Sequence, residues 1–235
     1  MEQAHAEGYD AKLILERGLQ ATLAVKAGEA AFERDGVLFA KPDDPFPLLA
    51  GLMRVAALHE GRLDVLDFGG ALGSTYFQCR PWLEGLPSLR WRVVEQTHFV
   101  ACGREQIAAG PLEFLERIED CTLGGVPNVA IFSGVLQYVP DPDEVIRRTA
   151  ALGVQHVIVD RTPVIEAGRD IIAVQVVPSS IVRSKYPVRL FSRRHFLSKM
   201  EQNYRLISGF KALEGVLGGL FRPVEFRGFI FDRRP

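Results

Sequence analysis

Residues 63–73 read Leu63-Asp64-Val65-Leu66-Asp67-Phe68-Gly69-Gly70-Ala71-Leu72-Gly73, and this segment says more about the fold than any other part of the chain. A short apolar run leads into an acid and a glycine-rich turn, and residues 74–83 read as the helix that follows. Glycines let a chain turn tightly and approach a ligand, while the start of a helix offers unpaired N–H groups. The segment therefore predicts a strand, a ligand-binding turn and a helix.

Strand and helix patterns alternate after this segment. Asp141 and Pro142 are favourable at the N-cap and in the first turn of a helix, which predicts a helix that ends near residue 152. Strands that alternate with helices specify an α/β fold with a doubly wound, mainly parallel sheet. The other predicted elements are a helix at residues 98–109 and short strands at residues 90–95, 112–116, 128–132 and 156–160.

The two ends of the chain differ from this alternating core. Apolar residues at helical spacing predict one helix over residues 9–33 and a second over residues 47–59, with a proline-containing loop between them. We therefore expect an N-terminal helical extension over residues 1–60 and the main domain over residues 61–235. Within the tail we expect extended segments at residues 171–177 and 188–191, a helix at residues 192–202, and closing strands at residues 204–210 and 225–232.

Composition limits the class of partner. The 235 residues are enough for one α/β core and too few for two ordinary domains. A net charge of −1 provides no basic field for nucleic acid or an anionic membrane. The three cysteines have no zinc-site spacing and are an odd number, so neither a metal site nor a disulfide framework is expected. With no leader pattern and no apolar run of about 20 residues, we expect a cytoplasmic protein with a small-molecule partner and no membrane span.

Two classes of nucleotide ligand compete for the glycine turn. A dinucleotide pattern read from Gly69 would require glycine at 71 and glycine or alanine at 74, where Ala71 and Ser74 stand. The S-adenosylmethionine pattern places an acid at the strand end before G-x-G-x-G, and residues 67–73 match it except for the middle glycine. Asp67 would also attract a cationic cofactor. The turn therefore favours S-adenosylmethionine, and it accommodates Ala71 if the φ angle there is negative.

Two segments beyond the turn add to this prediction. Glu95 ends the second strand, where a carboxylate accepts hydrogen bonds from ribose hydroxyls; the alternative is a surface acid. Ser133-Gly134-Val135-Leu136-Gln137-Tyr138-Val139, followed by Pro140-Asp141-Pro142, resembles the segment beside the cofactor in class I methyltransferases.

The chain also resembles one family over nearly its whole length. The strings at residues 65–78 (VLDFGGALGSTYFQ) and 158–163 (IVDRTP), with those at 28–35 and 186–192, are similar to a bacterial family of S-adenosylmethionine-dependent methyltransferases that is often associated with surface-polysaccharide gene clusters. The resemblance implies a Rossmann-like class I sheet of seven strands and a methyl-transfer reaction. It implies cofactor-binding roles for Asp67, Gly69, Gly70, Ala71, Gly73, Glu95, Glu116 near the adenine, Ser133 near the sulfonium, and Gly134.

Methyl transfer to a neutral hydroxyl needs a base, and positioning supplies most of the remaining catalysis. His98 starts the helix after Glu95, and His195 lies in the tail; the alternative for each is a surface or capping histidine. Asp160 and Arg161 end the fifth strand and could orient an acceptor, or could form an ion pair that holds the following loop. The catalytic candidates are therefore His98, Asp160 and His195.

The acceptor side of the site has its own candidates. Tyr76, Gln137 and Tyr138 flank the expected cofactor position, and Arg161 could orient the acceptor. We expect residues 165–200 to form a cap on this side, where Arg189 would suit an anionic acceptor; the alternative is ordinary surface.

The leading function is O-methylation of a small-molecule or saccharide acceptor. A non-catalytic protein that binds S-adenosylmethionine or assists assembly is the alternative, while Ala71 and Ser74 disfavour an NAD-type oxidoreductase. The N-terminal helices could cover the active site or a second copy of the chain, so a homo-oligomer stays open.

Overall fold

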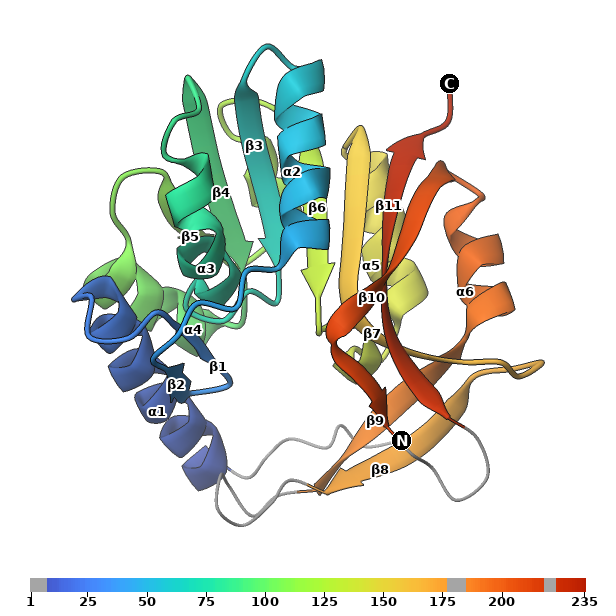
Figure 1. Ribbon diagram of the computed structural model, residues 1–235, viewed down its shortest axis with the longest axis horizontal. Coiled ribbons are helices and arrows are strands. Elements are labelled where there is room, and N and C mark those ends of the chain that lie inside the picture. Colours follow the sequence, from blue (N-terminus) through green and yellow to red (C-terminus); the bar gives the residue numbers. More distant parts are fainter. Residues whose placement is uncertain (1–7, 177–184, 218–222) are drawn as a thin grey trace.

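A single large sheet runs through the protein in the computed structural model, which describes residues 8–176, 185–217 and 223–235 (Figure 1). The strand order along its main path is β10-β11-β7-β6-β3-β4-β5. Five neighbouring strands, β7, β6, β3, β4 and β5, are parallel to one another. Strand β11 is antiparallel to both of its neighbours, β7 and β10. The seven strands are β3 (Arg62–Phe68), β4 (Ser88–Val94), β5 (Leu112–Leu115), β6 (Val129–Ser133), β7 (His156–Ile165), β10 (Tyr204–Leu217) and β11 (Val224–Arg233). The predicted doubly wound, mainly parallel sheet is confirmed.

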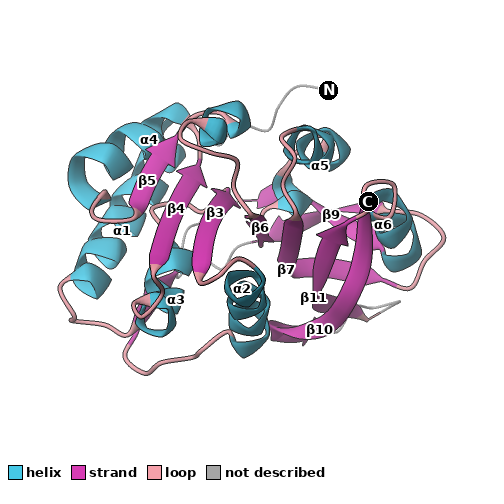
Figure 2. Ribbon diagram, turned by 90° about the horizontal axis from the view of Figure 1, so that it is seen from above, coloured by secondary structure: helices cyan, strands magenta, loops and turns pink. Residues whose placement is uncertain are grey.

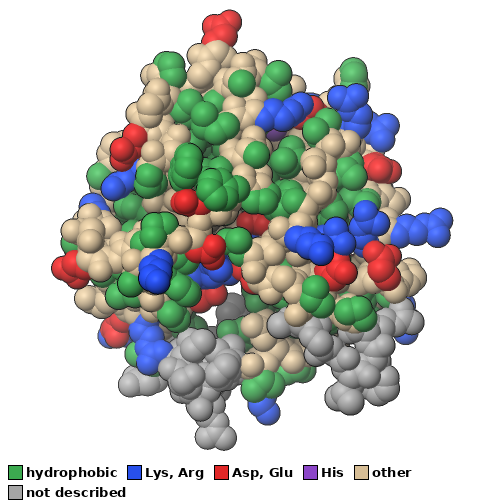
Figure 3. Space-filling model, in the orientation of Figure 1, with side chains coloured by type: hydrophobic (Ala, Val, Ile, Leu, Met, Phe, Trp, Pro, Cys, Tyr) green, Lys and Arg blue, Asp and Glu red, His purple; other side chains and the backbone are tan. Residues whose placement is uncertain are grey.

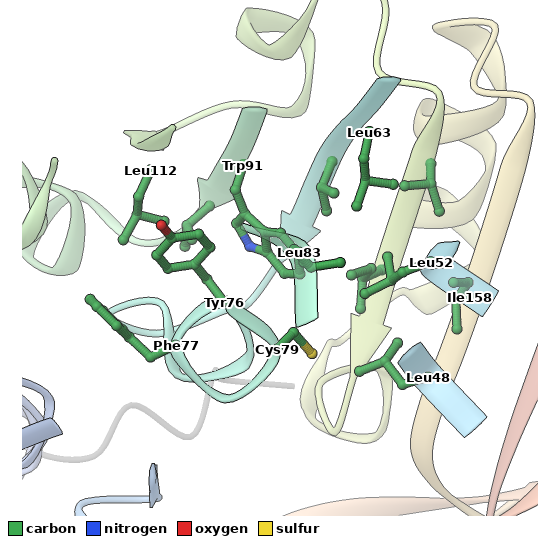
Figure 4. Packing of buried hydrophobic residues seen from close by; sticks show 14 of the residues in the cluster. Leu48, Leu52, Leu63, Tyr76, Phe77, Cys79, Leu83, Trp91, Leu112 and Ile158 are labelled. Carbon is green, nitrogen blue, oxygen red and sulfur yellow. The ribbon is translucent and has the colours of Figure 1, made fainter. Parts of the chain in front are cut away.

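Helices cover both faces of this sheet (Figure 2). Helices α2 (Phe46–Leu58) and α3 (Ser74–Leu83) pack on one face, where Trp91 and Leu63 are fully buried (Figure 4). Helices α5 (Pro142–Ala151) and α6 (Arg193–Met200) pack on the other face. Parallel strands buried on both sides need nearly continuous apolar sequence, which explains the runs that the sequence shows.

Helix α2 belongs to the same core as the strands. A Cβ atom on its Gly51 would lie 2.7 Å from Ile158 Cδ1, so the glycine lets the helix approach β7 closely. Its Arg54 forms a bidentate ion pair with Asp232 of β11, in which both N–O distances are 2.8 Å. Helix α2, which lies in the predicted N-terminal extension, therefore packs directly on the sheet of the main domain.

The N-terminal segment contains a hairpin that the sequence interpretation missed. Helix α1 (Gly8–Lys26) ends before residue 33, and β1 (Phe32–Arg34) pairs with β2 (Val37–Phe39) instead of continuing the helix. Asp35 and Gly36 form the two-residue turn with positive φ angles of 53° and 74°. An Asp-Gly pair is a preferred turn of this kind, which is why the strands form. The prediction of one helix over residues 9–33 was therefore wrong at its end.

Several predicted boundaries also shift. The helix expected at residues 98–109 is α4 (Thr97–Cys102) followed by a π-helical turn at Gly103–Ile107. Gly103 permits this because a Cβ atom there would lie 2.6 Å from Phe114 Cδ1 of β5. The Asp141 N-cap is confirmed, since its carboxylate accepts the Glu144 N–H at 2.9 Å. Two 3₁₀ turns complete this half, η2 (Ile118–Thr122) and η3 (Leu136–Tyr138).

The tail adds a second hairpin at the end of β7. Strand β8 (Ile171–Val176) pairs with β9 (Lys185–Ser192), and β9 joins the last residues of β7. The predicted segment at 171–177 agrees with β8 up to residue 176, and residue 177 lies outside the described residues. No helix in the described ranges has the length and apolar content needed to cross a membrane.

Candidate functional site

Many of the predicted site residues lie near the edge of the sheet where the parallel strands end. Asp67 near the end of β3 pairs in register with Val93 of β4 and Ile131 of β6, and Ser133 at the end of β6 pairs with Asp160 of β7. These ends lie at one edge of the sheet, beside the β1–β2 hairpin (Figure 1). Ligands of doubly wound sheets bind outside this edge, so it is the candidate site.

The glycine turn has the geometry of a close-approach loop. Gly69 has a φ of +71°, and a Cβ atom there would lie 2.3 Å from Val135 Cγ2, so only glycine fits. Gly73 has a φ of +90° just before α3. Ala71 has a φ of +49°, which corrects the expectation of a negative angle. A left-handed non-glycine residue costs about 1–2 kcal/mol, so the surrounding contacts must hold Ala71 in place.

One such contact comes from Glu95. Its carboxylate accepts the backbone N–H group of Gln96 at 2.8 Å, and the Ala71 N–H lies close enough to this carboxylate to lower its pKa. Burial is the main cause that raises the pKa of Glu95, and these N–H groups oppose it. The acid at the end of β4 is therefore joined directly to the glycine turn after β3.

Asp67 lies beneath the turn rather than at its surface. Trp91 Nε1 donates a hydrogen bond to Asp67 Oδ2 at 2.9 Å, and Oδ1 has no hydrogen-bond partner among the described residues. A Cβ atom at Gly70 would lie 2.5 Å from Asp67 Oδ2, so the carboxylate presses against the turn from below. Burial raises the pKa of Asp67 to about 7. This carboxylate supports the turn, while its predicted attraction of the cofactor stays a prediction.

Two further candidates lie at the exposed rim near β5. Glu116 follows β5 and accepts a hydrogen bond from Thr97 Oγ1 at 3.0 Å. His98, in the first turn of α4, is exposed and close enough to Glu95 to lower the pKa of that acid. The rim thus places Glu95, Glu116 and His98 together.

The end of β6 and the middle of β7 form the other half of the site. Asp160 and Arg161 do not end the strand as expected, because β7 continues to Ile165. The Gly134 N–H donates to the Asp160 carbonyl at 3.0 Å, and a Cβ atom on Gly134 would lie 3.5 Å from Arg161 Cζ. Asp160 is buried, which raises the pKa of its carboxyl to about 6. Asp160 is the register partner of Ser133, so both residues lie at the edge of the sheet where the glycine turn is found.

Arg161 lies in a bulge of β7. The register with β11 shifts between Val159 and Thr162, and Arg161 has a φ of +53°. Its guanidinium forms ion pairs with Glu214 of β10 and, at 3.7 Å, with Asp35. Arg161 therefore pairs with Glu214 and Asp35 rather than with Asp160, and an acceptor-binding role stays a prediction.

Gln137 and Tyr138 lie in η3 beside Arg161. Gln137 is buried and donates from Nε2 to the Arg161 carbonyl at 3.4 Å. Tyr138 is exposed, and its hydroxyl donates to Gln175 Oε1 of β8 at 2.7 Å. Both are placed at the predicted acceptor side.

Tyr76 lies elsewhere. Its ring is buried in the core beside Trp91, with ring centroids 5.7 Å apart, and Figure 4 shows it among the core side chains Phe77 and Leu112. The expectation that Tyr76 lines the open site is corrected by this packing, because the first turns of α3 point the ring toward the sheet.

Arg189 and His195 lie in a separate pocket of about 120 Å³ between β9, α5 and α6. Arg189 Nη1 is 3.6 Å and His195 Nδ1 is 3.5 Å from the Asp170 carboxylate. Side chains alternate along a strand, so Arg189 and Tyr186 project from opposite faces of β9. The structure does not bring Arg189 or His195 together with the strand-end residues.

Two acids that the sequence interpretation missed also approach the site. Glu33 in β1 is buried; it accepts the Gly36 N–H at 3.1 Å and a hydrogen bond from Ser74 Oγ, at the start of α3. Glu214 lies where the β10–β11 register shifts between Lys211 and Val216. The Asp-Gly turn was the available signal for the hairpin that carries Glu33, whereas a bulge in a long strand leaves no comparable sequence signal.

The residues present fit S-adenosylmethionine. Glycines keep the turn free of side-chain bulk, and Glu95 provides a carboxylate beside it. In the described part of the chain, no group of three or more His, Cys, Asp or Glu side chains is arranged to hold a metal ion.

Comparison with known proteins gives a structural likeness only. No protein-family model and no curated protein matches the chain. The N-terminal domain of EvdMO1, crystallised with S-adenosylhomocysteine (SAH) and D-fucose, has a TM-score of 0.53 at 15% identity over 92% of this chain and 96% of that chain. The same domain with SAH alone has a TM-score of 0.52 at 16% identity and the same coverage. Full-length EvdMO1 has a TM-score of 0.50 at 13% identity, over 99% of this chain and 50% of that chain. Together with the strand order and the antiparallel β11, this likeness shows that the chain has the Rossmann-like class I methyltransferase fold.

Proposed function

We propose that this chain is an S-adenosylmethionine-dependent methyltransferase that methylates a hydroxyl oxygen of a small-molecule or saccharide acceptor. The observation that carries the proposal is the contact between Glu95 and the Ala71 N–H, because it joins the ribose-binding position to the glycine turn. We further propose that the protein acts in the bacterial cytoplasm, in surface-polysaccharide synthesis.

Each half of the strand-end edge has a role in this proposal. The backbone of residues 69–73 approaches the cofactor, Glu95 binds the ribose, and Glu116 lies near the adenine, while Asp67 supports the turn from below. Ser133, which ends β6, and Gly134, which follows it, face the sulfur end. When bound, S-adenosylmethionine supplies a methyl group already activated by a positively charged sulfur.

Asp160 is the base that the geometry favours. It lies between the Gly134 segment and Arg161, and a carboxyl with a pKa of about 6 exchanges protons near neutral pH. Its carboxylate would take the proton from the acceptor hydroxyl as the new carbon–oxygen bond forms and the methyl–sulfur bond breaks, with SAH as the leaving group. His98 at the rim is the second candidate, and His195 is the third, in its separate pocket.

One observation keeps the alternative open. Asp160 is only 7% exposed, and the neighbouring Arg161 is occupied by carboxylates. A protein that binds S-adenosylmethionine without turnover would tolerate such enclosure. EvdMO1's N-terminal domain was crystallised with SAH and D-fucose, so sugars are the first acceptors to assay.

Titration calorimetry with S-adenosylmethionine and SAH tests the cofactor. We expect binding to the wild type, a loss of at least about tenfold in Glu95→Ala, and no change in Glu113→Ala, whose carboxylate pairs with Arg90 on the far edge of the sheet. No binding to the wild type would overturn the proposal.

Turnover is tested separately with radiolabelled S-adenosylmethionine and a panel of sugars. Methyl transfer that is lost in Asp160→Asn, with SAH affinity unchanged, supports the assignment of the base. Cofactor binding without transfer to any acceptor favours the non-catalytic alternative.

A further inference from the structure

Four charged side chains from three distant segments form a ring at the acceptor side of the site. Arg34 and Asp35 belong to the β1–β2 hairpin, Arg161 to β7 and Glu214 to β10. Arg34 Nη1 lies 3.7 Å from Glu214 Oε1, which also pairs with Arg161, and Arg161 Nη2 lies 3.7 Å from Asp35 Oδ2. Each guanidinium in the ring therefore has a carboxylate partner.

Bulges in two strands produce this ring. Arg161 lies in the bulge of β7, and Glu214 lies in the irregular part of β10, on opposite sides of β11. A bulge redirects side chains out of the regular alternation, and bulges are common beside active sites. Without these bulges, the side chains of Arg161 and Glu214 would project from the sheet in the regular alternation between its two faces.

The ring adjoins the proposed cofactor position. Arg161 lies next to Gly134, and Glu33 of the same hairpin binds Ser74, which follows the glycine turn. Figure 3 shows this face hollowed below the sheet, with both acidic and basic side chains around the hollow. An acceptor that approaches the sulfur end of the cofactor from the open side would therefore meet the ring.

The charges of the ring leave no surplus cation. Asp35 and Glu214 balance Arg34 and Arg161, and the buried acids Glu33 and Asp160 lie close behind them. A phosphate group would have to compete with carboxylates already bound to both guanidinium groups. An uncharged acceptor meets no such repulsion.

The unsatisfied atoms here are hydrogen-bond acceptors. Glu214 Oε2 and Gln137 Oε1 are buried without a partner among the described residues. The hydrogen bond from Gln137 Nε2 to the Arg161 carbonyl fixes which end of that amide is the oxygen. Such oxygens need donors, which hydroxyl groups supply and phosphate oxygens do not. At the tip of the hairpin, the Asp35 side chain is 81% exposed.

An aromatic surface lies beside the ring. Tyr138 and Tyr186 meet edge to face with ring centroids 5.9 Å apart, and Asp35 is close enough to raise the pKa of Tyr138. Tyr138 is exposed and Tyr186 is half-buried, and accessible aromatic rings next to a carboxylate suit a molecule that has both C–H faces and hydroxyl groups.

We propose that the ring of Arg34, Asp35, Arg161 and Glu214 is the specificity element of the acceptor site, selecting an uncharged, hydroxyl-rich acceptor and excluding phosphate-bearing ones. This inference rests on the proposed methyltransferase function. It makes the hairpin turn and Glu214 part of the acceptor site.

Binding of sugars to the SAH complex tests the proposal, with ligand-observed NMR as the readout. The probes are D-galactose and D-glucose, each compared with its 1-phosphate ester. We expect the neutral sugars to bind more tightly than the esters to the wild type. The variant Asp35→Asn/Glu214→Gln frees both guanidinium groups, so we expect the esters to gain about fivefold or more in affinity.

Glu113→Gln is the matched control, because it removes the carboxylate of a comparable Arg pair on β5. We expect it to leave the sugar preference unchanged. Equal or tighter binding of the esters to the wild type, no detectable binding of the neutral sugars, or the same gain in Glu113→Gln would overturn the inference. SAH binding is measured first, so failure of the cofactor proposal is recognised separately.

Discussion

At the scale of single residues, the glycine turn shows how sequence and packing share the specification of a site. The sequence predicts a close-approach turn from the positions of Gly69, Gly70 and Gly73, and the structure has one there. The conformation of Ala71 was not predictable from the same pattern, because it depends on the contact with Glu95 from another strand. Local propensity suggests a turn, and tertiary contacts select its dihedral angles.

Gly69→Ala should be strongly destabilising. The substitution adds left-handed strain of about 1–2 kcal/mol and a clash with Val135, whose Cγ2 would lie 2.3 Å away. We expect a loss of about 3 kcal/mol or more in the free energy of unfolding, measured by urea titration. Gly28→Ala is the control, since Gly28 has a φ of +79° with nothing within 4 Å, and should lose only the strain. Equal losses in the two variants would contradict the packing explanation.

The buried carboxyl of Asp67 should make stability depend on pH. Burial raises its pKa to about 7 from the ordinary aspartate value of 3.8, so between these pH values the folded protein holds a proton that the unfolded chain releases. Stability contributed by this group is full below about pH 4 and is lost as the pH rises through about 7, by an amount on the order of 4 kcal/mol.

Asp67→Asn isolates this effect, because the amide oxygen can still accept the Trp91 hydrogen bond without titrating. Urea unfolding of both proteins between pH 4 and pH 8 should show the variant gaining relative to the wild type as the pH rises. A difference that stays constant over this range would show that Asp67 does not titrate there.

At the scale of elements, prediction succeeded where periodicity is strong. Strands β3, β4, β6 and β7 follow from their apolar runs, although β7 extends to residue 165 because β9 and β11 provide partners that the sequence does not reveal. The β1–β2 hairpin was missed because its strands have only three residues each, within an apparent helical pattern. Asp35-Gly36 was the stronger signal.

The same limit applies to the candidate site. Glu95 and Ser133 could be placed because the ends of parallel strands meet at one edge. Asp160 lies in the middle of β7, and its register pairing with Ser133 brings it to the same edge. Tyr76, Arg189 and His195 could not be placed, because the face from which a side chain projects depends on how its helix or strand docks. Glu214 became visible only through the bulge in β10.

The docking of α2 should depend on Arg54. Its ion pair with Asp232 is bidentate, and His156 Nδ1 contacts the same carboxylate at 2.8 Å. Arg54→Gln leaves this half-buried carboxylate without its guanidinium, and we expect a loss of about 1–3 kcal/mol in unfolding free energy. Arg90→Gln is the control at the more exposed Arg90–Glu113 pair, where less than about 1 kcal/mol is expected. The explanation fails if the control loses as much.

At the scale of the whole molecule, three segments that are far apart in sequence meet at one edge of the sheet. The hairpin near residue 35, the bulge of β7 and the bulge of β10 are linked through Arg161 and Glu214. Glu33 continues this link to Ser74 and hence to the glycine turn. Cofactor binding at the turn and the order of the hairpin should therefore be coupled.

Hydrogen exchange measures this coupling directly. Binding of SAH should slow amide exchange in residues 32–39 as well as in residues 67–73, because ordering the start of α3 also orders its Glu33 partner. Glu33→Gln should reduce the protection of the hairpin while leaving that of the turn largely intact, since Glu95 still holds Ala71. The amides of β11 are the internal reference and should change little. Protection confined to the turn in the wild type would mean that the hairpin packs against the site without responding to cofactor binding. The ring of charged residues at the acceptor side would then be a fixed surface.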